Sequence, residues 1–135
     1  MITGGIVMQT LKFEPSWDKA LSNKDRELIA DIFTESSFQD ETDTVKLTPI
    51  WHAKNYKDEL LITVLIHNFT DQTMTFHNTT LAYIETDQTI AEHSFTLPAL
   101  VIEPKSSMPW TFIFPVDSQK ATSTLVNGTL QIISS

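Results

Sequence analysis

From residue 44 onward the chain consists of short runs of β-branched and aromatic residues separated by turn residues, and this pattern limits the possible folds more than any other feature. The run "ELLITVLIHNFT" (59–70) is almost continuously apolar from Leu60 to Ile66, which indicates a strand buried on both faces and central in its sheet. The preceding run, "VKLTPIWHAKN" (45–55), contains Pro49. Proline cannot donate to a ladder, so this run indicates an edge strand or a bulge.

The rest of the chain continues the β pattern. The segment "MTFHNTTLAYIE" (74–85) reads as one interrupted strand or two short ones. The later runs are "TIAEHSFTL", "LVIEP", "SSMPWTFIFP" and "TLQIIS". Asn127-Gly128 predicts a tight hairpin turn before the last of them. Roughly seven short strands with turns every 8–12 residues are typical of a sandwich or barrel. We therefore predict a mainly β fold, an antiparallel Ig-like β-sandwich.

The region before residue 44 has a different period. Apolar residues recur at helical spacing from Leu21 to Phe33, and Ser22 with Asp25 three positions later resembles a capping box, so we predict one N-terminal α-helix over residues 22–36. Phe13 and Trp17 precede it as candidate anchors. The acidic segment "SSFQDETD" (36–43) reads as a loop, and strands begin at residue 44.

The predicted helix and strands fit one domain covering residues 8–135. Residues 1–7 read as a non-native leader or a flexible arm. The letters "TGGIVM" are what a purine-rich ribosome-binding site encodes when it is read through into a downstream start codon, which makes Met8 the expected native start. The N-terminal residues lack the basic and long apolar regions of a signal peptide.

Composition narrows the function classes. The chain has a formal net charge of −8 and only 9 lysines and arginines, which are scattered, so we expect neither nucleic acid nor an anionic membrane surface as a partner. It has no cysteine, which excludes disulfides, thiolate metal sites and a cysteine nucleophile. A chain without cysteine and without a signal peptide fits the cytoplasm, where we expect this protein to act.

Few residues suggest chemistry. The sequence has no G-x-S-x-G elbow and only 3 glycines, so we expect no catalytic residues, no enzyme activity and no cofactor. Among the four histidines, His67 and His77 flank one predicted hairpin and form a weak candidate site. No carboxylates are positioned beside them by the pattern, and we interpret them as separate histidines with no metal.

The stretch "SSMPWTFIFP" (106–115) places Met108, Trp110, Phe112 and Phe114 on one face of a strand. That face is too apolar to remain wet in a monomer, so we interpret it as core, and we expect Trp110 and Trp51 both to pack between the sheets. The alternative is that Trp110 and Trp51 form an exposed aromatic patch that binds a partner or a sugar.

Five segments together resemble one family: "TPIWHAKN", "ELLITVLIHN", "TTLAYIE", "IAEHSFTL" and "VIEPKSSMPWTFIFP". They are similar to the SLAP domain of Gram-positive bacteria, named for S-layer assembly proteins of the accessory Sec pathway. The resemblance covers about Trp17 to Pro115. The motif positions are Trp51, Ala53, Asn55, Asn68, Ala91, Phe95, Ile102, Pro104, Ser107, Met108, Pro109, Trp110, Phe112 and Phe114. His67 departs from the pattern, which has an arginine before the asparagine.

The resemblance implies a non-enzymatic protein-interaction module, here as a single stand-alone copy. Its partner would be an accessory Sec motor or an exported surface protein, which the sheet edges or the acidic helix face would hold. The resemblance transfers no catalytic residue. Most motif positions also have an expected structural role, such as Asn55 and Asn68 in turns. A small ligand- or carbohydrate-binding sandwich remains the alternative function. The oligomeric state is left open by the sequence.

Overall fold

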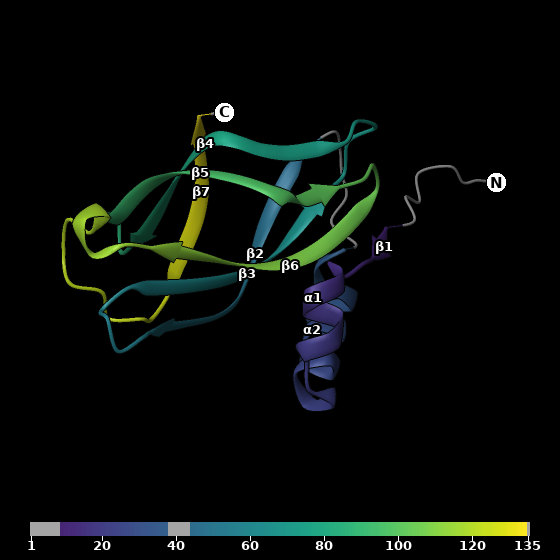
Figure 1. Ribbon diagram of the computed structural model, residues 1–135, viewed down its shortest axis with the longest axis horizontal. Coiled ribbons are helices and arrows are strands. Elements are labelled where there is room, and N and C mark those ends of the chain that lie inside the picture. Colours follow the sequence, from purple (N-terminus) through teal and green to yellow (C-terminus); the bar gives the residue numbers. More distant parts are fainter. Residues whose placement is uncertain (1–8, 38–43, 135) are drawn as a thin grey trace.

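The computed structural model describes residues 9–37 and 44–134 and shows two packed sheets with two helices on one side (Figure 1). One sheet has the order β1-β6-β3-β2 and the other the order β5-β4-β7. All strand pairs are antiparallel except β1 with β6. The prediction of a mainly β, seven-stranded sandwich is confirmed. Residues 1–7 lie outside the described residues.

The strands have the following bounds: β1 Thr10–Leu11, β2 Val45–Lys54, β3 Leu60–Asn68, β4 Met74–Glu85, β5 Gln88–Ile102, β6 Ser106–Phe114 and β7 Gly128–Ser134. Their number agrees with the prediction, but their composition differs. The predicted runs 89–97 and 100–104 join into the single strand β5, whose register against β4 shifts near Pro98. The short β1 was not predicted, because a strand of 2 residues has no periodicity to read.

Two helices precede β2, where the sequence predicts one. Helix α2 spans Asn23–Ser36, and its N-cap Ser22 accepts a hydrogen bond from the backbone N of Asp25. The additional helix, α1, spans Pro15–Ala20. Pro15 stands in its first turn, where a missing N–H costs nothing, and the Glu14 side chain caps it. No helix among the described residues is long and apolar enough to cross a bilayer.

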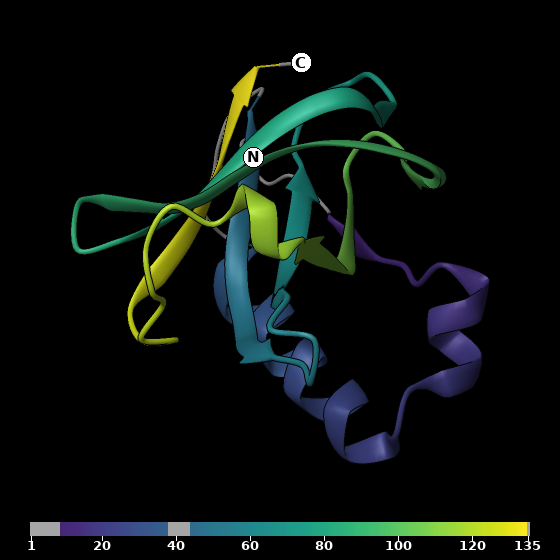
Figure 2. The same ribbon diagram turned by 60° about the vertical axis from the view of Figure 1, so that its left-hand side comes forward.

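The central strand β3 is apolar on both faces because both faces are largely buried. Leu60, Ile62, Val64 and Ile66 are fully buried and point into the sandwich, where they belong to the core cluster. Leu65 and His67, on the opposite face, are also fully buried, and α2 packs against this strand and β2. One face of β3 therefore meets the other sheet, and part of the other face meets α2 (Figure 2).

The predicted hairpin at Asn127-Gly128 is wrong. Asn127 has φ 57° as in a tight turn, but β7, which begins at Gly128, pairs with β4 and not with the preceding strand β6. Gly128 is required for another reason. A Cβ there would lie 2.1 Å from the Tyr83 hydroxyl oxygen, so no side chain fits where β7 crosses the Tyr83 ring. Glycine here marks a close approach of two strands.

Candidate functional site

The residues of the "SSMPWTFIF" motif have two different environments. Met108, Phe112 and Phe114 are at most 5% exposed and point into the core. Trp110 is half-buried: it packs against the core cluster, and its ring stacks on Trp17 of α1 with centroids 6.4 Å apart. Trp110 therefore joins α1 to the core, and the expectation that it lies in the core is met in part, because it is not fully buried.

The expectation that Trp51 packs between the sheets is wrong: Trp51 lies on the outer face of its sheet, because β2 contains a bulge. Pro49 pairs with Val64, which points inward, and the register then shifts so that Trp51 pairs with Thr63 on the outer face. A shift of one residue moves every later side chain to the opposite face. Ala53 pairs with Leu61 on the same outer face. Trp51 and Trp110 thus lie in different environments and form no common aromatic patch.

The remaining core positions of the motif lie in β5. Ala91 is fully buried, and Phe95 is 6% exposed. The Phe95 ring contacts the rings of Phe112 and Phe114 edge-on, each at a centroid distance of 5.2 Å. These contacts join β5 to β6 across the sandwich, since the two strands belong to different sheets.

The two motif asparagines hold turns. Asn55 accepts hydrogen bonds from the backbone N atoms of Lys57 and Glu59 at 2.9 and 3.0 Å, which closes the turn between β2 and β3. Asn68 is fully buried at the opposite end of β3. Its amide donates to the carbonyls of Gln72, Ile102 and Glu103, and its carbonyl oxygen accepts from Thr70. Asn68 thereby joins the β3–β4 turn to the β5–β6 turn.

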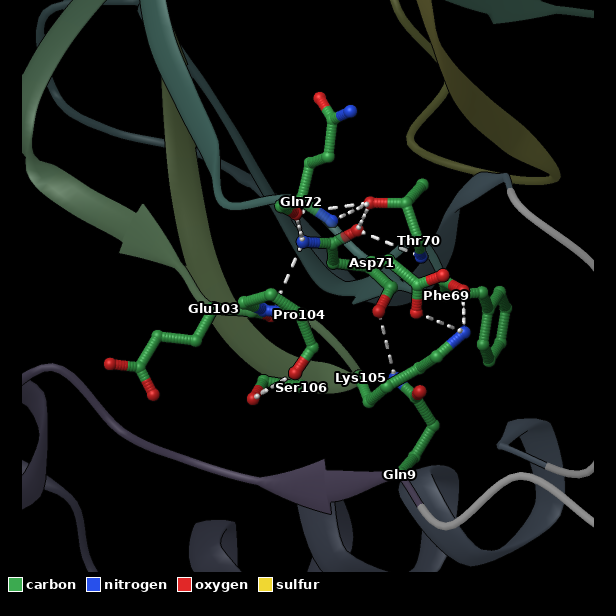
Figure 3. A network of polar contacts seen from close by, with 10 residues as sticks. Gln9, Phe69, Thr70, Asp71, Gln72, Glu103, Pro104, Lys105 and Ser106 are labelled. Carbon is green, nitrogen blue, oxygen red and sulfur yellow. Dashed lines mark hydrogen bonds and ion pairs between the residues drawn. The ribbon is translucent and has the colours of Figure 1, made fainter.

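Lys105 strengthens the same junction (Figure 3). Its backbone has φ 56°, and its ammonium group donates to the carbonyl of Phe69 at 2.6 Å and lies 3.5 Å from the Asp71 carboxylate. Pro104 precedes it in the turn, and Ser106 begins β6. The polar groups at this end of the sandwich are therefore directed at one another, as internal supports of the two turns.

A pocket of about 490 Å³ borders this junction. It lies beside the start of β4 and the turn before it. Its polar lining includes Thr70, Gln72, Thr75 and His77, its apolar lining includes Val45 and Ile132, and none of the described lining residues is an aspartate, glutamate, lysine or arginine. The pocket could accept a small uncharged ligand.

The surroundings of His67 do not resemble those of a metal ligand. It is fully buried between α2 and the sheet, with Nε2 2.8 Å from the Ser36 hydroxyl and Nδ1 2.6 Å from the Ser107 hydroxyl. Burial, helped by the nearby charge of Lys46, lowers the pKa of His67 to about 4. The ring is therefore neutral at pH 7.

His77, by contrast, is exposed on β4, in the other sheet. The candidate pair His67 and His77 thus lies in two separate environments. Among the described residues no group of three or more His, Cys, Asp or Glu could hold a metal ion.

The bond directions around His67 are fixed by its neighbours. The Ser36 hydroxyl donates its single proton to the Ile32 carbonyl at 2.5 Å, so the Nε2–H of His67 donates to Ser36. Nδ1 then accepts from the Ser107 hydroxyl, which in turn accepts from the side-chain amide of Gln9 at 3.1 Å. A neutral histidine fits this chain, and it joins α2 to β6 through β3.

A second buried polar cluster was not predicted from the sequence. Glu85, at the end of β4, is 4% exposed, and its carboxylate accepts from the hydroxyls of Tyr83, Ser123 and Thr124 and from two backbone N atoms. The backbone donors are Thr124 and Leu125, at 2.9 and 3.1 Å. The only sequence signal was a carboxylate two residues after Tyr83, on the inward face of a strand.

The pKa values of Glu85 and Tyr83 in this cluster are strongly shifted. Burial alone would raise the pKa of Glu85, but the hydrogen bonds from Ser123, Thr124 and Tyr83 outweigh it and lower the pKa to about 2. Burial and the neighbouring carboxylate raise the pKa of Tyr83. His52 lies at the edge of this cluster, 3.3 Å from the Tyr83 hydroxyl. Glu85 accepts five hydrogen bonds, so it has little capacity left for a substrate proton and instead anchors the segment 123–125.

The comparisons with known proteins agree with the motif residues. A family model described as the SLAP domain matches residues 11–130, which is most of the chain. The match includes every motif position from Trp51 to Phe114 and the Glu85 cluster. No curated protein and no solved structure matches the sequence. On the strength of the family match, this chain belongs to the SLAP domain family.

Proposed function

We propose that this SLAP domain is a non-enzymatic protein-interaction module that works in the cytoplasm and assists accessory Sec-dependent export or the assembly of S-layer and other cell-surface proteins. The observation that carries the proposal is the family match over residues 11–130. The partner in this proposal is the accessory Sec motor or the exported surface protein itself.

The arrangement of polar groups supports a binding role. The buried polar side chains Asn68, His67 and Glu85 all serve internal contacts, which hold turns, helix and loop in place. A scaffold in which these three buried groups are satisfied internally holds its turns, helix and loop in place and presents a constant surface to a partner. The net charge of −8 favours a basic partner over an acidic one.

Cross-linking in the native Gram-positive host tests the proposal. A tagged chain that begins at Met8 is cross-linked in growing cells, purified under denaturing conditions and analysed by mass spectrometry. We expect enrichment of the accessory Sec motor or of unprocessed surface-protein precursors over a tagged control protein of similar charge. Removal of the gene should also lower the amount of surface protein exported. Unchanged export together with no such cross-link would reject the proposal.

A second candidate function rests on the pocket of about 490 Å³ beside His77, whose described lining is without aspartate, glutamate, lysine or arginine. Its threonine hydroxyls, Gln72 and the imidazole can donate to and accept from the hydroxyls of a small carbohydrate. A glycan array followed by titration calorimetry tests this function. We expect any binding to be lost in Thr75→Val and kept in the Thr122→Val control, which changes an exposed threonine outside the pocket lining.

A further inference from the structure

The four outer edges of the two sheets are protected to very different degrees. A strand edge presents unpaired N–H and C=O groups that recruit another strand, and proteins block such edges with proline, charge, bulges or covering segments. The outermost strands are β2 and β6 in one sheet, with the short β1 beside β6, and β5 and β7 in the other.

Three of these edges are blocked. β2 contains Pro49, a bulge and two lysines. β6 contains Pro109, is paired with β1 at its first two residues and carries Trp110 stacked on Trp17. β5 contains Pro98 and Glu92, and the backbone of 119–121 pairs with it at Ile90 and Ala91.

The edge of β7 lacks most of these devices: its one irregularity is a bulge at Ile133, near the end of the strand, where the register against β4 shifts. Its sequence "GTLQIIS" contains no proline and no charged residue. Within residues 9–37 and 44–134, its backbone pairs with β4 alone. Ile133 is 52% exposed, and Thr129 and Gln131 are exposed as well. Both views show β7 (yellow) clear of the two helices (Figures 1 and 2).

The side chains beside this edge specify what could pair with it. Ile132 of β7 and Val45 and Leu47 of β2 pack against the core but stay only partly buried, and the two strands lie next to each other at this corner of the sandwich. An added strand with apolar residues at alternate positions would cover them. Before the bulge at Ile133, its intervening residues would lie beside Thr129 and Gln131, so small uncharged or β-branched side chains suit those positions.

We propose that β7 is the docking edge of this domain and that it pairs with an extended segment of a client polypeptide, with alternating apolar and Thr- or Ser-type residues and basic flanks. The inference deepens the proposed function, on which it rests, because an export client that has not yet folded exposes such segments. A second copy of the chain is the less suitable occupant. Self-association would bring together two chains of charge −8, whereas basic flanks on a client gain attraction from that charge.

The test uses the synthetic peptide Lys-Thr-Val-Thr-Ile-Thr-Val-Thr-Lys, labelled with a fluorophore, and the full chain. Binding is followed by fluorescence anisotropy, and amide hydrogen exchange shows which strand becomes protected. A peptide N-methylated at alternate residues serves as the first control, since it keeps the side chains but cannot form a ladder. We expect saturable binding of the unmodified peptide only, with protection confined to 128–134.

The decisive variant is Gln131→Lys with Ile133→Lys, which places two charges on the exposed side of β7. Its matched control is Val101→Lys with Ile113→Lys, which adds the same charge at positions 44% and 46% exposed on the edge strands β5 and β6. We expect the β7 variant to bind about tenfold more weakly or worse, and the control to bind as the unaltered chain does. Circular dichroism verifies that both variants are folded.

Several outcomes would overturn the inference. Equal peptide binding by the two variants, or protection of a strand other than β7, would exclude this edge. A dimer seen by analytical ultracentrifugation that only the β7 variant dissociates would make a second copy the occupant. The proposed function is judged separately. Export partners recovered by a chain whose β7 binds no peptide would leave that function standing and reject the edge, and peptide binding without export partners would do the reverse.

Discussion

The molecule contains two buried polar clusters. The titratable group at the centre of one cluster is neutral, and the group at the centre of the other is charged. At the junction of α2 and the sheet, His67 has two hydrogen-bond partners, both serine hydroxyls, and is neutral. At the end of β4, Glu85 has five donated hydrogen bonds and remains charged, with its pKa lowered to about 2. Both groups are nearly inaccessible to water.

The difference shows which hydrogen-bond partners a buried charged group needs. Burial disfavours the charged form of either group. Only an opposite charge or hydrogen bonds to the charged form can reverse that effect, and these bonds need donors for a carboxylate and acceptors for an imidazolium. Glu85 has enough donors, two of them backbone N–H groups held by the chain itself. His67 has no acceptor for a second proton beyond Ser107, whose own proton already points at the ring, and Lys46 lies nearby. Histidine therefore suits this position in its neutral form.

The largest expected effect comes from removing the charge of Glu85. Glu85→Gln keeps the size of the side chain but replaces one acceptor oxygen with a donor, which then faces donors from 123–125. We expect a loss of about 3 kcal/mol in the free energy of unfolding. Urea denaturation followed by tryptophan fluorescence measures it. The exposed Glu92→Gln serves as the control, and a loss for Glu85→Gln no larger than for this control would show that the carboxylate is not the anchor of the segment.

The second prediction separates the two clusters by pH. The folded pKa of His67 is about 4 against an ordinary 6.5, so the unfolded chain binds more protons between these values and stability falls as the pH falls through that window. We expect His67 to account for about 2 kcal/mol of lost stability between pH 7 and pH 5. Glu85, with a folded pKa of about 2 against 4.5, contributes its loss only at lower pH.

The variant His67→Leu isolates the contribution of His67. It removes the titrating group, so its unfolding free energy should fall less steeply than that of the unaltered chain between pH 7 and pH 5. His52, whose pKa is lowered by burial despite the nearby Glu85, contributes to the same window in both proteins and cancels in the difference. Parallel pH profiles for the two proteins would contradict the assignment of a neutral, buried His67.

The sequence predicts some parts of the molecule well and others poorly. The doubly apolar run of β3 and the capping signal at Ser22 identified a central strand and the start of α2, because these signals are local. Pro49 correctly indicated an edge strand and a bulge. The consequence for Trp51 could not be read, since the face of a side chain after a bulge depends on which residue is left unpaired.

The Glu85 cluster shows the other limit. Its donors Ser123 and Leu125 lie 38 and 40 residues downstream, in a segment without regular structure. No periodicity links such positions. The hairpin prediction at Asn127-Gly128 was wrong for a related reason. The same two residues suit a hairpin turn and a position where the Tyr83 ring lies against the backbone. Only the pairing of β7 with β4 distinguishes the two.

A smaller effect is expected when His67 loses one of its two partners. Ser107→Ala removes the hydroxyl that donates to Nδ1 and leaves a fully buried acceptor without a partner. We expect a loss of about 1.5 kcal/mol at pH 7. Thermal and urea unfolding measure it, with Ser134→Ala at an exposed position as the comparison. A loss equal to that of Ser134→Ala would mean that the ring is held by packing and not by its hydrogen bonds.

The smallest expected effect comes from removing one of the five donors to Glu85. Thr124→Ala deletes the hydroxyl at 3.0 Å from Oε1 but keeps the backbone N–H of the same residue at 2.9 Å. Four donors remain, so the carboxylate stays charged and the expected loss is about 0.5 kcal/mol. The pKa of Glu85, followed by NMR titration of its side-chain carbon, should rise only slightly. A loss above that of Ser107→Ala would reverse the comparison, because the cluster with more donors would then be the one more sensitive to losing any single one.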